Sequence, residues 1–301
     1  MTQLAAAPRV SPIARSERPR TARLLVTCAD RPGIVAAVSG FLYRQGANVV
    51  QSDHYSTDAE VGRFFMRVVF SHPDVDGQLD LLRLRFAKDV ADAFDMWFQL
   101  RPESSRPRLA IFVSRQDHCL LELLWRWQRG QLSADIGLVI SNHADLRAAV
   151  EGFGVPFEHV PLQPGGKAEA EARQLELVLG RFDLVVLARY MQVLSGDMLQ
   201  RLGVPAVNIH HSFLPAFSGA RPYEQAQRRG VKLIGATAHY VTEDLDEGPI
   251  IEQDVIRVNH RASVAELTRL GADIERAVLA RAVEWHCTDR VLLNGHTTVI
   301  F

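Results

Sequence analysis

Residues 183–188, Asp-Leu-Val-Val-Leu-Ala, form a short run in which every side chain after the first is apolar. A strand without polar alternation is typical of a parallel sheet that helices cover on both faces. Upstream, the hydrophobic periodicity predicts strands over 108–114, 135–141 and near 157, and helices over 119–128, 145–152 and 167–179. Strands that alternate with helices in this way predict an α/β fold with an open, mostly parallel sheet.

The carboxyl ends of these strands mark the place where a ligand site is expected, because open α/β sheets bind ligands in the crevice beyond them. The first strand-to-helix turn, Ser114-Arg115-Gln116-Asp117-His118, contains no glycine. A dinucleotide site or a P-loop needs glycine there so that backbone amides can approach phosphate. The sequence therefore argues against a nucleotide cofactor.

A later strand is predicted over 206–211, Ala-Val-Asn-Ile-His-His. Side chains alternate with period two along a strand, so Asn208 and His210 share one face, and the residue after each lies on the other face. The loop over 212–222 follows at the rim of the sheet, where catalytic groups are commonly carried. The sequence thus presents an amide and an imidazole together.

An acidic loop over 242–249 separates two more predicted strands, 234–241 and 250–258. Its four carboxylates predict mutual repulsion that raises the pKa of one of them toward the working pH. Asp246, which precedes the turn at Gly248-Pro249, is the candidate for this raised pKa.

Asn208, His210 and Asp246 suit attack on an acyl carbon. Asn208 can donate to the developing oxyanion, an effect worth about 3 kcal/mol. His210 can share that charge or move a proton to the leaving nitrogen, and Asp246 can position and deprotonate water. Each residue also has a structural explanation: a cap at the strand end, a hydrogen-bonded rim histidine and a solvated loop charge, respectively.

The segment 206–212 is compatible with two other kinds of site. A metal site built from His210, His211 and Asp246 is disfavoured, because adjacent side chains on a strand diverge. Ser212 lacks the G-x-S-x-G elbow of a hydrolase triad. Cys119 lies on the apolar side of its helix and is expected in the core rather than as a nucleophile. We therefore expect no metal.

The amino-terminal third shows a different order of elements. The pattern predicts strands over 23–28, 48–57, 63–71 and 96–100 and helices over 33–46 and 80–94. This is the ferredoxin-like β-α-β-β-α-β arrangement. A domain of about 80 residues buries a core on one sheet face only, so docking or pairing of the other face is expected.

The turn Asp30-Arg31-Pro32-Gly33-Ile34 resembles the signature of ACT domains, and the resemblance covers residues 23–101. It implies regulatory binding of an amino acid at Asp30, Gly33 and Ile34, where a helix start favours a carboxylate. Asn48, at the start of the second strand, is the other ligand position that it implies. A tight turn and a strand start without any ligand form the alternative.

Composition limits what else the chain can be. With 301 residues it suits two domains, and a Pro/Ser/Arg linker over 102–107 separates 23–101 from 108–301. A net charge of −1 provides no field for nucleic acid. Three separated cysteines favour a cytoplasmic location, and no apolar run reaches the roughly 18 residues of a membrane span. Residues 1–22 resemble a transit peptide in composition, but their prolines favour a disordered arm.

Residues 108–290 resemble the formyltransferase family, whose fold is Rossmann-like. The run Val207-Asn208-Ile209-His210-His211-Ser212-Phe213-Leu214-Pro215 carries the family's Asn-x-His motif, and Gly235–Val241 with Leu245–Ile250 matches the segment bearing its catalytic aspartate. The resemblance implies that Asn208, His210 and Asp246 are catalytic and that His239 supports them.

The same resemblance implies a folate site. The strand exit 189–194, with Met191, Gln192 and Val193, is similar to the segment that faces the pterin. The resemblance also implies that the loop from Val241 to Asp246, which includes Thr242, closes the other side. By spacing alone, Met191 and Val193 are equally consistent with core residues. The reduced folate is then the substrate, so no separate cofactor is expected.

The glycine-free first turn departs from the glycine-rich loop with which glycinamide ribonucleotide transformylases hold phosphate. Together with the fused ACT-like module it resembles the formyltetrahydrofolate deformylase family. This implies hydrolysis of 10-formyltetrahydrofolate to formate and tetrahydrofolate, a role in one-carbon metabolism and purine biosynthesis, and methionine or glycine as effector. Pairing through the ACT-like sheets predicts a homo-oligomer. A formyltransferase with an amine acceptor and a folate-sensing regulatory protein are the alternatives.

Overall fold

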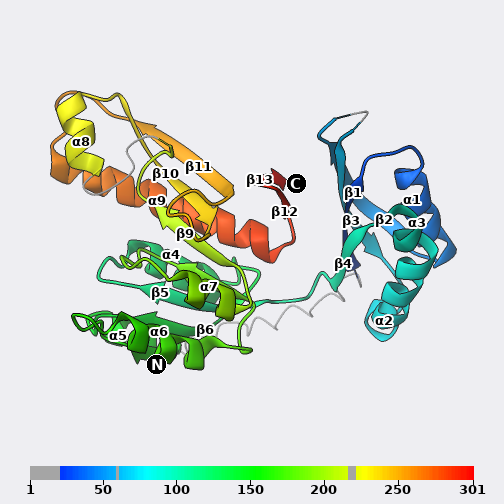
Figure 1. Ribbon diagram of the computed structural model, residues 1–301, viewed down its shortest axis with the longest axis horizontal. Helices are drawn as coiled ribbons and strands as arrows, with labels where there is room; N and C mark the ends of the chain where they lie inside the picture. The colour runs from blue at the N-terminus through cyan, green and yellow to red at the C-terminus, as the bar shows by residue number, and fades with distance from the viewer. Residues whose placement is uncertain (1–20, 59–60, 216–221) are drawn as a thin grey trace, which may run out of the picture.

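The computed structural model describes residues 21–58, 61–215 and 222–301, which form two lobes that each have their own sheet (Figure 1). The arm expected at the amino terminus falls almost wholly outside the described residues. Residues 21 and 22 are described, and they belong to the first strand rather than to the arm.

The smaller lobe has the predicted β-α-β-β-α-β order. Its elements are β1 (Thr21–Ala29), α1 (Ile34–Arg44), β2 (Asn48–Ser56), β3 (Arg63–Ser71), α2 (Val75–Phe86), the π-helix η1 (Ala87–Ala91), α3 (Asp92–Phe94) and β4 (Trp97–Pro102). The antiparallel sheet has the order β2-β3-β1-β4. The second helix begins five residues earlier than predicted, because Asp74 caps it by accepting a hydrogen bond from the Gly77 amide.

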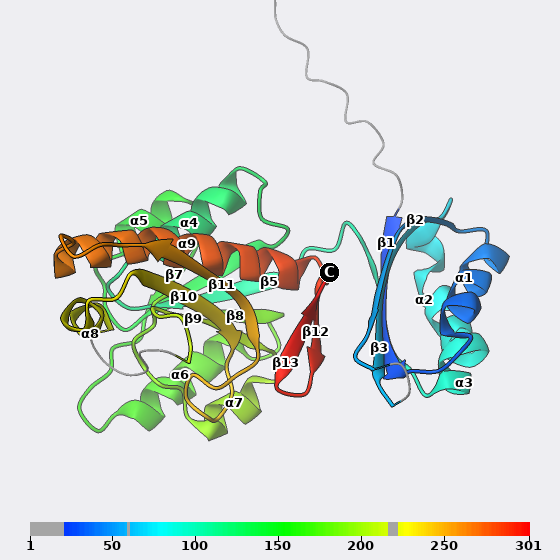
Figure 2. The ribbon, with the colours of Figure 1, turned by 90° about the horizontal axis from the view of Figure 1, so that it is seen from above.

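The two faces of this sheet pack differently. One face meets α1 and α2 through a core that includes Phe41 and Phe86. The other face turns toward the larger lobe, where Leu25 and Phe65 bury Leu292 of a carboxy-terminal hairpin (Figure 2). The face that the small domain cannot cover alone is therefore partly covered by docking, as the sequence predicts.

The larger lobe contains a seven-stranded sheet of order β11-β10-β9-β8-β5-β6-β7. Its strands are β5 (Arg108–Val113), β6 (Asp135–Ser141), β7 (Phe157–His159), β8 (Leu184–Leu187), β9 (Ala206–His210), β10 (Leu233–Tyr240) and β11 (Ile250–Arg257). The pairs from β7 to β9 are parallel, and β10 runs antiparallel to both of its neighbours. The mostly parallel α/β sheet is thus confirmed.

Helices cover both faces of this sheet. The helices are α4 (His118–Gln128), α5 (Arg147–Gly152), α6 (Lys167–Val178), α7 (Gly196–Leu202), α8 (Pro222–Arg229) and α9 (Val264–Cys287), followed by the hairpin of β12 (Val291–Asn294) and β13 (Thr297–Ile300). Buried side chains of α4 and α9 pack on one face, and those of α6 and α7 pack on the other. Residues at the carboxyl ends of β8 and β9 line a cavity.

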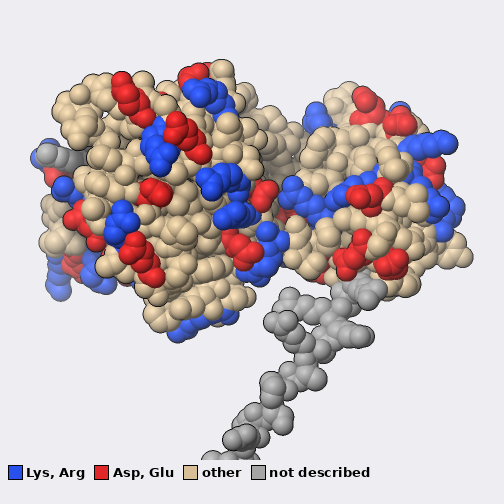
Figure 3. Space-filling view, turned by 90° about the horizontal axis from the view of Figure 1, so that it is seen from below, with Lys and Arg blue, Asp and Glu red and all other residues tan. Residues whose placement is uncertain are grey.

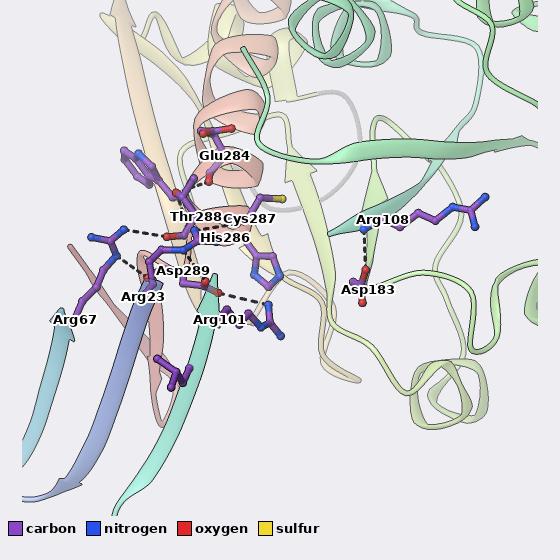
Figure 4. Close-up of polar contacts among 12 residues, drawn as sticks. Arg23, Arg67, Arg101, Arg108, Asp183, Glu284, His286, Cys287, Thr288 and Asp289 are labelled. Atoms are coloured by element: carbon purple, nitrogen blue, oxygen red, sulfur yellow. Dashed lines mark hydrogen bonds and ion pairs between the residues drawn. The ribbon is translucent and has the colours of Figure 1, made fainter. Parts of the chain in front are cut away.

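The two lobes meet at the end of α9 (Figure 4). Arg67 of β3 donates to the carbonyl oxygens of Thr288 and Asp289 at 3.2 and 3.0 Å. The Asp289 carboxylate also lies 3.3 Å from Arg23 and 3.5 Å from Arg101. Arginines of the small sheet therefore face the carbonyl end of a helix, where its dipole favours cations.

Basic and acidic side chains are interspersed over the face drawn in Figure 3. Within the described part of the chain, none of the helices combines the length and the hydropathy that crossing a membrane requires.

Candidate active site

Asn208 and His210 stand at the carboxyl end of β9. The antiparallel neighbour β10 places His239 opposite Asn208 and Thr237 opposite His210. Asn208 is half-buried and His210 is buried. Both point to the side where the loop after β10 returns, as the period-two prediction required.

That returning loop carries Asp246 to the two histidines. Its Oδ1 lies 3.2 Å from His210 Nδ1 and 3.6 Å from His239 Nε2. Asp246 has a left-handed backbone (φ 60°), and Gly248 follows it closely. A Cβ on Gly248 would lie 1.7 Å from the Tyr240 carbonyl oxygen, so only glycine lets the loop pass this strand end.

The predicted raised pKa of Asp246 is wrong. The hydrogen bond that His210 donates holds the pKa of this carboxyl well below its usual range, although burial opposes it. Its acidic neighbours in the loop, Glu243, Asp244 and Glu247, are exposed to solvent, which screens their repulsion. Asp246 is therefore a carboxylate at neutral pH.

His239 connects Asn208 to this carboxylate. Its Nδ1 lies 2.8 Å from the Tyr240 carbonyl oxygen, which can only accept, so Nδ1 carries the proton. His239 Nε2 then accepts from the Asn208 amide at 3.2 Å. This hydrogen bond uses one N–H of the Asn208 amide and fixes the orientation of the Asn208 side chain.

The second ring nitrogen of His210, Nε2, is buried and has no hydrogen-bond partner among the described residues. A buried polar nitrogen without a partner costs free energy, about 1 to 3 kcal/mol. It is therefore available to a bound molecule. The neighbouring His211 packs against Tyr223, and burial together with the charge of Arg189 lowers its pKa to about 4.

These residues line a cavity of about 540 Å³. The strand exit after β8 forms one wall and residues 241–246 form the other, with Met191, Gln192, Val193 and Thr242 in the lining. Met191 and Val193 are 56% and 54% exposed, so they line the cavity and are not core residues. The structure thus brings the sequence-predicted catalytic and folate residues together.

Sequence reasoning missed a buried network beside this cavity. Glu275 of α9 accepts hydrogen bonds from His118 and Tyr223 and lies 3.4 Å from Arg189. A lone acid in an amphipathic helix resembles a solvated charge, so no local pattern identified Glu275. Cys119 is buried in the core, as expected.

The predicted regulatory positions separate into two places. Asp30, Gly33 and Ile34 line a cavity of about 640 Å³ together with His54 and Ser56. Asn48 starts β2 opposite Ser71, at the far end of the sheet from this turn. Within one chain Asn48 therefore does not belong to that cavity, because β2 runs the full length of the sheet between them.

The fold and the site together define the class of protein. Residues 107–283 match the family model described as formyl transferase, and residues 22–83 match the ACT domain. The chain thus joins a formyl transferase catalytic domain, with Asn208, His210 and Asp246 at its strand ends, to an ACT domain.

Similar proteins narrow this class. The chain is 56% identical over 279 residues to a formyltetrahydrofolate deformylase of Mycobacterium tuberculosis, covering 93% of this chain and 90% of that protein. It is 52% identical over 281 residues to one of Bacillus subtilis, covering 93% of each. A crystal structure of a formyltetrahydrofolate deformylase from Pseudomonas syringae superposes with a TM-score of 0.91 at 46% identity, over 95% of this chain and 96% of that one. The chain belongs to the formyltetrahydrofolate deformylase family.

Proposed function

We propose that this chain hydrolyses 10-formyltetrahydrofolate to formate and tetrahydrofolate. One observation carries the catalytic assignment: an ionised Asp246 lies within 3.6 Å of both His210 and His239, at the end of a cavity that Asn208 also lines. A carboxylate, an imidazole and an amide donor at one point supply what acyl hydrolysis needs.

In the proposed reaction, Asp246 accepts a hydrogen bond from a water and holds its oxygen toward the formyl carbon. The Asn208 amide donates to the oxygen that becomes negative as the water attacks, and His210 Nε2 donates to it in the imidazolium form, in which both ring nitrogens carry a proton. The proton that the water loses passes through the Asp246–His210 pair to N10 of the folate. The bond between the formyl carbon and N10 then breaks, and tetrahydrofolate and formic acid leave; the acid releases its remaining proton to solvent as formate.

The folate is proposed to lie between the two walls of the cavity. Met191 and Val193 offer exposed apolar surface to a flat ring, and the backbone after β8 offers amides and carbonyls for its edge. In this proposal the reduced folate is the substrate and the reaction needs no resident cofactor or metal.

The test is formate release from 10-formyltetrahydrofolate without any added amine. We expect stoichiometric formate and tetrahydrofolate, and a rate that falls by several orders of magnitude in Asp246→Asn while folate still binds. Formate that appears only with an amine acceptor would make the chain a formyltransferase. If the unmodified chain binds folate without turning it over, and Asp246→Asn keeps the same regulatory function, the chain would be a folate sensor.

The ACT domain is proposed to bind an amino-acid effector at the cavity lined by Asp30, Gly33 and Ile34. The amide end of α1 there favours a carboxylate. Calorimetric titration with methionine and with glycine tests this, with Gly33→Val as the variant expected to lose binding. Absence of heat with both amino acids would count against an amino-acid effector.

Pairing through the small sheet is proposed as the basis of a homo-oligomer. Strand β2 is an edge strand of that sheet, and Val50 and Tyr55 on it are 61% and 50% exposed. An edge with exposed apolar side chains is a template for a second copy. Sedimentation should show at least a dimer, and Val50→Lys should weaken it.

A further inference from the structure

The strand order of the large sheet has a switch point between β5 and β8. From β5 the chain adds β6 and β7 on one side, and β8 and β9 follow on the other. Open α/β sheets bind ligands at such a switch point, beyond the carboxyl ends of the two strands. The turn 114–118 after β5 and the turn that starts at Arg189 after β8 border this crevice.

In this chain the two turns bind each other. The Ser114 amide donates to the Arg189 carbonyl oxygen at 3.2 Å, and the Met191 amide donates to Ser114 Oγ at 3.0 Å. The Arg189 guanidinium donates through Nε to Gln116 Oε1 at 2.5 Å. Side chains and backbone of the protein thus use the hydrogen-bonding groups that a ligand in the crevice would need.

Glu275 holds Arg189 in place from the core. Its Oε2 lies 3.4 Å from Arg189 Nε and accepts from His118 Nε2 at 2.8 Å, while Oε1 accepts from Tyr223 at 2.6 Å. Burial alone would raise the pKa of Glu275, but His118, Arg189 and Tyr223 outweigh it and lower the pKa to about 2. The charge that anchors Arg189 therefore persists at neutral pH.

The backbone of Arg189 is strained in this position, because its φ of 62° lies in the left-handed region. A left-handed backbone costs a branched or long side chain about 1 kcal/mol. Arg189 is nevertheless only 6% exposed, and it lines the cavity of the catalytic residues. Arg189 thus lines that cavity and also holds together the two turns at the switch point.

His118, Cys119 and Glu275 also offer possible metal ligands within 4.8 Å of one another. Both oxygens of Glu275 already accept hydrogen bonds, and Arg189 places a positive charge beside them. A cation would have to displace these partners, so the group fits an anchor better than a metal site.

We propose that Gln116, Arg189 and Glu275 form a barrier that keeps amine acceptors away from the formyl carbon and thereby makes water the acceptor. This inference rests on the proposed function, because it explains why that function is hydrolysis and not transfer. Gln116 and Arg189 are specificity-determining residues in this view, and Glu275 is a positioning residue that acts through Arg189.

Removing the side chains of the barrier should allow transfer of the formyl group to an amine. With glycinamide as a probe, its amine nitrogen would attack the formyl carbon and form a C–N bond as the bond to N10 breaks. The amine loses one proton and N10 gains one, so the products are N-formylglycinamide and tetrahydrofolate. No oxidant or further reactant is required.

The experiment measures the ratio of N-formylglycinamide to formate at a fixed glycinamide concentration. We expect no detectable formylated amine from the unmodified chain, and from Arg189→Ala and Gln116→Ala a ratio at least tenfold above the detection limit of the assay. Gln116 is exposed, so its variant tests the barrier even where Arg189→Ala fails to fold. Arg281→Ala is the matched control, because that arginine of α9 pairs with Glu252 and Asp254 away from the crevice.

An unchanged ratio in folded Gln116→Ala and Arg189→Ala would overturn the barrier, as would formylated amine from the unmodified chain. Formate release without glycinamide is recorded in the same assay. Its absence would count against the proposed hydrolysis itself, so the two failures are distinguishable.

Discussion

At the scale of single residues, the site depends on which atoms of the two histidines face Asp246. His239 donates from Nδ1 to a backbone carbonyl, so its Nε2 accepts from the Asn208 amide. His210 uses Nδ1 on Asp246, which leaves Nε2 without a partner among the described residues. Both nitrogens of His239 are thus held by the protein, whereas His210 has one nitrogen, Nε2, left for the reacting group.

Replacing Asn208 by alanine should lower kcat about 10²- to 10³-fold, the effect of losing one oxyanion donor. KM should change little, because the donor acts mainly on the developing charge. Steady-state formate release measures both constants. Asn294→Ala, in the hairpin outside the cavity, should match the unmodified chain. A loss in kcat smaller than tenfold would remove Asn208 from this role.

Asp246→Asn should lower the rate by a constant factor from about pH 5 to about pH 9. The lowered pKa means that Asp246 is ionised throughout this range, so its titration does not shape the profile. If Asp246 had the raised pKa that its acidic loop predicts, the factor would shrink toward acid pH. Rate profiles of both forms, taken in parallel, separate these cases.

At the scale of elements, α9 connects parts of the molecule that lie far apart in the sequence. Glu275 joins it to α4 through His118 and to α8 through Tyr223. Gly271, one turn earlier, leaves room for Tyr223, since a Cβ there would lie 1.8 Å from the tyrosine oxygen. The helix therefore supports the catalytic edge of the sheet as well as its face.

Glu275→Gln should lower the free energy of unfolding at neutral pH by about 3 kcal/mol, the equivalent of a pKa depressed from 4.5 to about 2. A carboxyl whose pKa is lower in the folded than in the unfolded chain stabilises the fold at pH values above its unfolded pKa. The difference in free energy of unfolding between the unmodified chain and Glu275→Gln should therefore shrink as the pH falls from 4.5 toward 2. Urea unfolding across a pH series measures it.

Glu176→Gln is the matched control, because its pair with Arg173 is solvent-exposed and contributes less than about 1 kcal/mol. If Glu275→Gln lowers the free energy of unfolding by the same amount at acid and at neutral pH, the loss comes from altered packing and not from the missing charge.

At the scale of the whole molecule, the junction of the lobes lies at the end of α9. The hairpin β12–β13 continues from it and fills the free face of the small sheet through Leu292. A second cavity, of about 870 Å³, lies along this junction and shares Val241 and Thr242 with the catalytic cavity. The small domain thus borders a cavity that reaches the strand end from which the Asp246 loop departs.

Arg67→Ala should destabilise the docked small domain by about 1 to 3 kcal/mol, because two carbonyl oxygens at the helix end lose their donor. Arg67 is buried at this point. Arg101→Ala, whose side chain is half-exposed, should cost less than about 1 kcal/mol. Thermal unfolding of the two variants should therefore differ, and equal midpoints would contradict a structural role for Arg67.

The order of residues alone implied the two α/β plans and the shared face of Asn208 and His210. Both follow from periods of two and 3.6 residues, which act between near neighbours. Family motifs then singled out Asp246. The helix α9 was not predicted, and neither was its acid Glu275.

The charge state of Asp246, the anchoring of Arg189 and the separation of Asn48 from Gly33 came from the folded chain. Each depends on groups that are distant in sequence and adjacent in space, and the free energy of a charge depends on its solvation and its partners. The acidic loop around Asp246 predicted repulsion, whereas a hydrogen bond from His210, on a strand distant in sequence, lowers the pKa of this carboxyl. Local pattern placed the catalytic side chains, and tertiary contacts set their chemistry.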